Sequence, residues 1–435
     1  MTAEICLMNK MGVALAADSA VTIGGGNKIY NSANKLFALS KFHPVGIMIY
    51  GNAFFLRAPW ETIIKLYREK LGRTEFERLD EYYNDFISFL TENEYDELTS
   101  AKEEDNYNIA VIEQIIENQH DEIMQVVKAF IDDHPETKQE DLQGITPELF
   151  RENIGGVLKS LESEDYIDGL SGGQLEFITN KYGDHIIHII QQYFGEIIFY
   201  EQQNAELEHI VKQKLLKRFS NQSSGVVMAG FGKKNIYPVV IAHQIDGKIA
   251  NQVKMSKITH DEIGAESNAG IYPFAQSEMV YSFLEGIDPE METLSNNYLY
   301  ETFHELSDIF IEQLEPVIKD GVNKEDLKSS IKSEFINVFD RYRETIESFR
   351  KREFTDPTLG ILRSLPKGEL AEMAEALVNL TSFRRKASGS LETVGGPIDV
   401  AVITKGDGFV WIKRKHYFDS DRNQHFYTNY FKEEN

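Results

Sequence analysis

The N-terminal stretch MTAEICLMNKMGVALAADSAVTIGGGNKIYNSANKLFALSKFHPVGIMIYGN (residues 1–52) decides the fold. A threonine follows the initiator methionine, and two apolar runs, 13–17 and 45–50, predict buried strands. Between the runs lie an aspartate, a threonine, a glycine-rich turn and a lysine. Polar chemistry at the first residues, enclosed by strands, indicates that the chain terminus takes part in the function. We expect removal of Met1, because threonine is small, and this would leave Thr2 with a free α-amine.

Short apolar runs separated by turn residues predict a β-meander in this stretch. Residues 5–8, 13–17, 36–39 and 45–50 read as strands, with a hairpin turn at 9–12. Gly24-Gly25-Gly26-Asn27 predicts a second turn, since glycine adopts positive φ without strain. A phosphate-binding loop is disfavoured, because no Lys-Ser/Thr follows the glycines at the required spacing.

Helical periodicity replaces the sheet pattern from about residue 58 to residue 219. Apolar residues recur at helical spacing over 108–131, and Pro147 behind Thr146 predicts the start of another helix. The histidines of Asp184-His185-Ile186-Ile187-His188 share a helix face, but no cysteine or carboxylate motif accompanies them. We therefore interpret them as ordinary surface histidines and expect no metal site.

Sheet pattern returns at 225–232 and 237–253, where Asp246-Gly247 predicts a tight hairpin. A small-residue loop at 263–270 is expected to lead into a helix near Pro273. A second helical block at 296–352, an amphipathic helix after Pro366 and a strand hairpin over 398–412 complete the pattern.

These observations predict one interrupted core rather than several independent domains, with no internal repeat. The predicted parts are a discontinuous core formed by 1–57, 220–284 and 363–418, a helical insertion at 58–219, a second at 285–362, and a C-terminal tail at 419–435.

Composition limits the function. The chain has 435 residues and a formal net charge of −25, which disfavours binding to nucleic acid or to an anionic membrane surface. Its single cysteine, Cys6, rules out an intrachain disulfide and reads as a buried strand thiol. No apolar run reaches the length of a membrane span, and no signal peptide is evident. We expect a cytoplasmic protein.

The first stretch carries the parts of a nucleophilic site. A threonine hydroxyl is a weak nucleophile without a base, but at an N-terminus its own α-amine can accept the proton. A nearby lysine would lower the pKa of that amine, and an aspartate would hold the lysine in place. A backbone N–H at a strand-end glycine could bind an oxyanion. Asp18, Lys35 and Gly51 supply one of each.

A family resemblance rests on the same residues. The segments GVALAADS (12–19) with Thr22, NKL (34–36) and YGNA (50–53) resemble the start of proteasome β-type and bacterial proteasome-like subunits of the HslV or Anbu kind. Those proteins are N-terminal nucleophile (Ntn) hydrolases with a four-layer αββα sandwich.

The resemblance implies roles for individual residues. Thr2 would be the nucleophile, Asp18 and Lys35 would tune it, and the N–H of Gly51 would form the oxyanion hole. Thr22 and Ser19 would line the substrate cleft.

Downstream, the match is looser. SGVVMAG (224–230) resembles the central strand of the family, while Ala265 stands where a supporting serine is usual. Ser267 and Glu266 are possible substitutes. In the late turn VGGPID (394–399), Val394 and Leu391 stand where the family has a serine and an aspartate, and Glu392 or Thr393 could substitute.

The resemblance thus implies an α+β αββα sandwich with two large helical insertions, acting as a threonine-type peptidase without a cofactor. It also implies a peptide or protein substrate, a homo-oligomer of ring type and a possible unfoldase partner. Two alternatives stay open: a non-catalytic proteasome-like scaffold subunit, and an Ntn amidase acting on a small-molecule amide. Taken alone, Asp18 would be a turn carboxylate, Lys35 a surface lysine and Thr2 a frayed terminus. Their joint placement favours a site.

Overall fold

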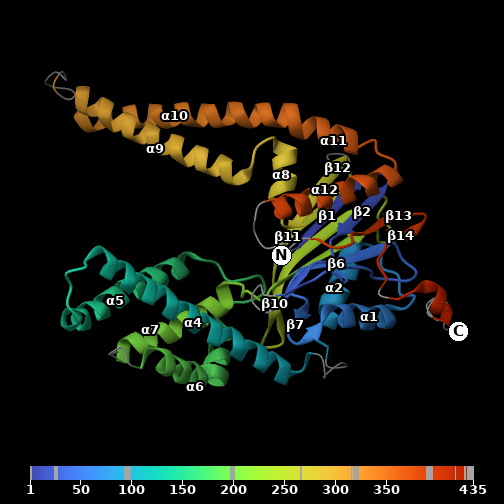
Figure 1. The fold of residues 1–435 in the computed structure, drawn as a ribbon, viewed down its shortest axis with the longest axis horizontal. Helices are drawn as coiled ribbons and strands as arrows, with labels where there is room; N and C mark the ends of the chain where they lie inside the picture. The colour runs from blue at the N-terminus through green and yellow to red at the C-terminus, as the bar shows by residue number, and fades with distance from the viewer. Residues whose placement is uncertain are drawn as a thin grey trace. The chain divides into compact units, whose positions relative to one another are not determined.

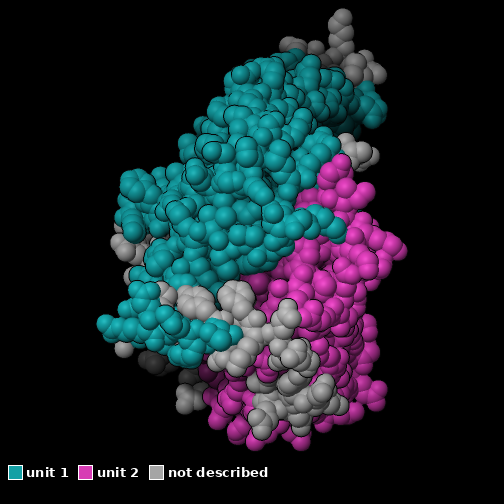
Figure 2. Space-filling model, turned by 90° about the vertical axis from the view of Figure 1, so that its right-hand side faces the viewer, with its two compact units in different colours: residues 1–36, 262–435 teal, residues 37–261 magenta. Residues whose placement is uncertain are grey.

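The structure is a computed structural model that describes residues 2–23, 28–92, 99–195, 201–264, 267–314, 316, 323–387, 395–416, 418–425 and 428. The chain divides into two compact units, residues 1–36 with 262–435, and residues 37–261, which Figure 2 colours separately. Each unit is built around one five-stranded sheet. The chain is therefore an α+β protein with two antiparallel five-stranded sheets and many helices, as the sequence predicts at this level.

The first unit contains the sheet with strand order β12-β1-β2-β13-β14. Its strands come from the two sequence segments of this unit, so the sheet joins the start of the chain to its last third. The strands of this unit are β1 (Ala3–Asn9), β2 (Gly12–Ala17), β3 (Val21–Ile23), β4 (Lys28–Tyr30), β12 (Ala269–Ala275), β13 (Asp399–Thr404) and β14 (Gly408–Lys413). Its helices are α8 (Glu278–Glu285), α9 (Pro289–Leu314), α10 (Lys324–Arg350), a π-helical turn (Lys351–Thr355), α11 (Asp356–Leu362), α12 (Lys367–Ala387) and a 3-10 turn (Ser420–Arg422).

The second unit contains the sheet with strand order β11-β10-β9-β6-β5. The strands of this unit, of which only Leu36 and Glu262 fall just outside its bounds, are β5 (Leu36–Ala38), β6 (Val45–Gly51), β7 (Phe54–Phe55), β8 (Ala58–Pro59), β9 (Ser224–Gly230), β10 (Val239–Ile249) and β11 (Gln252–Glu262). Its helices are α1 (Trp60–Leu71), α2 (Leu79–Phe89), α4 (Ala101–Asp133), α5 (Gln139–Ser163), α6 (Gln174–Phe194) and α7 (Glu201–Lys217).

In the first unit, α12 covers one face of the sheet. Successive strand side chains point to opposite faces, so Ala3, Ile5 and Leu7 of β1 share one side. These three belong to an apolar cluster with buried residues of α12 such as Leu370 and Leu377. Figure 1 shows α12 lying across β1 and β2. The amphipathic helix predicted after Pro366 is confirmed, and its apolar face fixes the position of β1.

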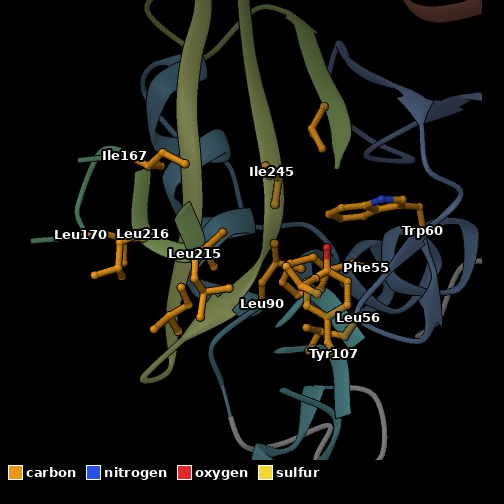
Figure 3. Packing of buried hydrophobic residues seen from close by; sticks show 14 of the residues in the cluster. Phe55, Leu56, Trp60, Leu90, Tyr107, Ile167, Leu170, Leu215, Leu216 and Ile245 are labelled. Carbon is orange, nitrogen blue, oxygen red and sulfur yellow. The ribbon is translucent and has the colours of Figure 1, made fainter. Parts of the chain in front are cut away.

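In the second unit, side chains from strands and helices share one large apolar cluster. Trp60 is 2% exposed, and its indole nitrogen donates a hydrogen bond to Ser224 Oγ at 2.9 Å, which ties α1 to β9. Figure 3 shows Phe55, Leu56 and Tyr107 gathered near the strand that carries Ile245. The helices between β8 and β9 therefore share one apolar core with this sheet.

The structure corrects the predicted turn at Asp246-Gly247. Strand β10 continues through both residues to Ile249, and the turn falls at Ala250 and Asn251, whose φ angles are +53° and +59°. Gly247 is needed within the strand for another reason. Its φ is +70°, and an added Cβ would lie 2.5 Å from the Tyr107 ring.

Two predictions based on proline are also corrected. Residues near Pro273 form the edge strand β12 rather than a helix, and Pro273 stands opposite Ile5. Proline is tolerated there because an edge strand leaves one row of N–H groups unpaired. Pro147 lies inside α5, which begins at Gln139, so it does not start that helix.

Helices α9 and α10 pack side by side and extend away from α8 (Figure 1). Most of their side chains are exposed, including apolar residues such as Tyr298 at 68% and Leu294 at 63%. Among the described residues, no helix is long and apolar enough to cross a membrane.

Candidate functional site

Thr2, Asp18 and Lys35 come together in the first unit. The Thr2 hydroxyl donates to Asp18 Oδ1 at 2.6 Å, and the Lys35 ammonium donates to the same carboxylate oxygen at 2.6 Å and to Thr2 Oγ1. All three residues are buried, with exposed fractions of 4%, 1% and 8% respectively. The hydroxyl is thus held between a cation and an anion in a site with little water.

The hairpin of β1 and β2 explains why residues 2 and 18 meet. Glu4 stands opposite Ala17 in the antiparallel register, and the N–H of Asp18 donates to the carbonyl of Ala3 at 3.1 Å. Continuing this register by one step places Asp18 opposite Ala3, and Thr2 is the next residue at the open end of the hairpin. Lys35 precedes β5 and reaches the same point.

Backbone N–H groups fix the orientation of the Asp18 carboxylate. Oδ1 accepts from the N–H of Ala3 at 3.1 Å, and Oδ2 accepts from Ala20 at 3.3 Å and from Gly395 at 3.0 Å. A carboxylate that accepts several backbone N–H bonds is held in one orientation. The late Gly-Gly turn identified in the sequence therefore supports the site through the backbone of Gly395.

Ser19 is engaged with the protein's own backbone. Its hydroxyl donates to the carbonyl of Pro397, and its N–H donates to the carbonyl of Gly395 at 3.1 Å. Thr22 lies in β3, opposite Ile29 of β4. The structure thus locks Ser19 next to the site and places Thr22 on a short strand that follows it.

Gly51 belongs to the second unit, at the end of β6 opposite Ser224. Its φ is +79°, and a Cβ there would lie 2.8 Å from the carbonyl oxygen of Ser223. Any larger residue would be strained, whatever the catalytic role of this position.

The structure does not bring Ser267 to Thr2. β12 runs antiparallel to β1, with Ala269 opposite Asn9 and Ala275 opposite Ala3. Ser267 therefore lies beyond the Asn9 end of β1, about 20 Å of strand away from Thr2. Glu266, Leu391, Glu392, Thr393 and Val394 lie outside the described residues, as does the turn at 24–27.

The sequence matches no family model and no curated protein. A solved structure, the Anbu (Gly-1) mutant from Hyphomicrobium sp. strain MC1, is similar over 100% of this chain and 99% of its own, with 10% identity and a TM-score of 0.27. A TM-score this low does not establish a shared fold, so the functional interpretation depends on the residues themselves.

Chemically, the cluster is suited to activating an alcohol. The Lys35 ammonium lies against the hydroxyl oxygen, where it can stabilise negative charge as the proton leaves. Asp18 accepts from both other groups, so it positions the hydroxyl and balances the lysine charge. The Cys6 thiol, on the same strand, is not a competing nucleophile, because burial raises its pKa and it stays protonated.

The sequence reasoning missed Glu4. This residue is 2% exposed, and neither carboxylate oxygen has a hydrogen-bond partner among the described residues. Burial raises the pKa of Glu4 well above its usual range, while Lys35 lowers it and Asp18 raises it further. A single acid within the apolar run AEICLM, two residues after the threonine, is a signal that could have identified it.

Proposed function

We propose that the protein is a threonine-type Ntn hydrolase that cleaves amide bonds in peptides after removal of Met1. One observation carries this proposal: the hydroxyl of the second residue is bound at once by a buried lysine and a buried aspartate. A frayed terminus would not bury such a cluster, because each unpaired charge in it would be costly.

In the proposed reaction, Thr2 Oγ attacks the carbonyl carbon and its proton passes to the Thr2 α-amine. The tetrahedral intermediate then expels the amine of the leaving peptide, which takes up that proton. Water hydrolyses the remaining ester and restores the hydroxyl. Lys35 stabilises the developing negative charge on Thr2 Oγ, and Asp18 holds Lys35 in place. By family resemblance, the N–H of Gly51 would serve the oxyanion, and Thr22 and Ser19 would border the substrate.

We extend the proposal to the architecture. The two antiparallel five-stranded sheets would form the inner layers of an αββα sandwich. The core would consist of residues 1–57, 220–284 and 363–418, with helical insertions at 58–219 and 285–362. The expected form is a cytoplasmic homo-oligomer, with ring assembly and an unfoldase partner as further possibilities to test.

Two measurements test the activity. Intact-mass analysis should show loss of Met1, because a retained methionine would leave no free Thr2 amine. Thr2→Ala should abolish peptide hydrolysis and labelling by a threonine-directed electrophile. Thr2→Ser is the matched control, since it keeps a hydroxyl and should retain measurable activity.

The outcomes separate the alternatives. Labelling that survives Thr2→Ala would refute the nucleophile. Loss of Met1 without hydrolysis of any amide would favour the scaffold reading. Hydrolysis of small amides but not of peptides would favour an amidase.

A further inference from the structure

Glu4 is a buried acid that the proposed reaction does not use. Both of its oxygens are buried and lack a hydrogen-bond partner among the described residues. A buried carboxyl without a partner is destabilising, and natural proteins rarely keep one without a reason.

Glu4 faces the same side of β1 as Thr2. Ala3 and Ile5 point into the apolar cluster under α12, so the intervening positions point to the opposite face. Residues two apart on one face of a strand are about 7 Å apart at Cα. A glutamate side chain can span that distance and reach back to the nitrogen of Thr2.

The other charged groups on this face already have partners. Asp18 and Lys35 bind each other and Thr2. Asp399 of β13 stands in the same row as Glu4, with Ala17 between them, and it accepts from both the N–H and the ammonium of Lys415. On β12, Phe274 stands opposite Glu4.

Two further positions on this face that titrate are Cys6 and Tyr272, which stand opposite each other. Both are neutral when protonated. The described part of this face therefore offers Glu4 no cation of its own.

Processing of the terminus changes the charge of this cluster. With Met1 in place, the Thr2 nitrogen is a neutral amide, and Lys35 and Asp18 balance each other. Removal of Met1 creates an ammonium beside Lys35, which leaves one uncompensated positive charge in a buried site.

We propose that Glu4 is the counter-charge of the processed terminus: its carboxylate pairs with the α-ammonium of Thr2 and holds that nitrogen beside the Thr2 hydroxyl. This inference rests on the proposed function. Glu4 is a positioning residue here, and it takes the place of the supporting serine and aspartate that this chain lacks at the usual positions.

The test measures the pKa of the α-amine directly. The full chain is released from a cleavable N-terminal fusion so that it begins at Thr2, and the terminus is acetylated with acetic anhydride from about pH 5 to about pH 10. Labelling is read by mass spectrometry. Glu4→Gln should lower the amine pKa by about one unit, a tenfold change in its acid dissociation constant, because the ammonium loses its anion. The acid limb of kcat/KM should shift equally.

Cys6→Ala is the matched control. It alters a buried side chain on the same face of β1 without changing charge, so the amine pKa should stay at the wild-type value. An equal shift in Cys6→Ala and Glu4→Gln would overturn the proposal, because packing rather than charge would then explain it.

Glu4→Leu keeps the proposal falsifiable if Glu4→Gln is unstable. In the uncleaved fusion Glu4 has no partner, so Glu4→Leu should raise stability towards urea; in the cleaved chain it should lower stability. An unchanged amine pKa, a loss of folding in the uncleaved fusion, or equal effects in both forms would each overturn the proposal.

The readouts also separate this inference from the proposed function. A lowered amine pKa without any hydrolysis would support Glu4 as the counter-charge and reject the hydrolase. Hydrolysis with an unmoved amine pKa would do the reverse.

Discussion

Two buried lysine–aspartate pairs, Lys35–Asp18 in the first unit and Lys254–Asp246 in the second, differ in what completes them. Lys254 donates to Asp246 Oδ2 at 2.8 Å and to the carbonyl of Arg218. Asp246 also accepts from the hydroxyls of Tyr107 and Ser220. These partners, Tyr107, Ser220 and the carbonyl of Arg218, come from the middle of the sequence and not from a chain terminus.

The Lys35–Asp18 pair instead closes on a hydroxyl at the second residue and lies near Glu4, whose carboxylate has no hydrogen-bond partner in the part of the chain that the structure describes. Burial alone therefore does not distinguish the two pairs. Their third partners differ: a tyrosine fixed on α4 in one case, and in the other a hydroxyl beside the chain terminus, which is the nucleophile of the proposed function.

Breaking the second pair should have the largest effect on stability. Lys254→Met leaves Asp246 buried without its cation and should lower the free energy of unfolding by about 3–5 kcal/mol. Urea unfolding measures this, with Asp246→Asn and the double variant completing a cycle in which the double loss is smaller than the sum.

The loss of unfolding free energy caused by Lys254→Met should depend on pH. Burial would raise the pKa of Asp246, but Lys254 and the hydrogen bonds from Ser220 and Tyr107 outweigh it and lower the pKa. The pair therefore stabilises the fold above about pH 4 and loses that contribution as the pH falls below it. A loss under about 1 kcal/mol at neutral pH would place this pair among weak surface bridges.

The matching change in the first pair should act on activity. Lys35→Met removes the cation at Thr2 Oγ1 and should lower kcat/KM for a peptide at least about a hundredfold, or about 2.7 kcal/mol in the barrier. Lys65→Met is the control, because Lys65 lies on an exposed helix face and pairs only with Glu61 in the structure's ion pairs. Full activity in folded Lys35→Met would make both pairs structural.

The smallest expected effect concerns His243, a half-buried polar group on β10. Its ring stacks on Tyr83 with centroids 4.6 Å apart, and burial lowers the pKa of His243 from 6.5 to about 4. The unfolded chain takes up a proton near pH 6.5 but the folded chain does not, so stability falls as the pH falls from 6.5 towards 4. The loss should be about 1–2 kcal/mol, reduced because the ring is only partly buried.

His243→Phe should remove this pH dependence while keeping the stacked ring. Unfolding free energies from about pH 7.5 to about pH 4.5 measure it. His188→Phe, at an exposed helix position, should leave the slope unchanged. If the unfolding free energy of His243→Phe fell with pH as steeply as that of the wild type, the pH response would have to come from other groups.

Local sequence signals predicted the first strands and the cluster of Thr2, Asp18 and Lys35, because these depend on short-range alternation and on one hairpin. The prediction of a single meander was wrong, since β1 and β2 belong to one five-stranded sheet and β5 and β6 to the other. Local signals failed where distant residues decide. Gly247 looked like a turn, but it accommodates the ring of Tyr107, which lies far away in sequence. Pro273 looked like a helix start, but the edge position of β12 allows it in a strand.

The same limit applies to the site. Ser267 was a reasonable substitute by alignment, yet the register of β12 against β1 places it at the wrong end of the strand. Glu4 was missed although its position within the apolar run AEICLM was an available signal of burial, because the role proposed for it depends on which groups surround it in the fold.

The hydrogen bond from Gly395 to Asp18 joins residues 377 positions apart. A ribosome adds about 5–20 residues each second, so Thr2 emerges roughly 20–75 s before Gly395 is made. Met1 can be removed early in that interval, while the carboxylate that positions the hydroxyl still lacks one of its donors. Under the proposed function, this order of synthesis would delay the complete nucleophile until nearly the whole chain exists, and it would protect the unfinished chain and its neighbours from premature cleavage.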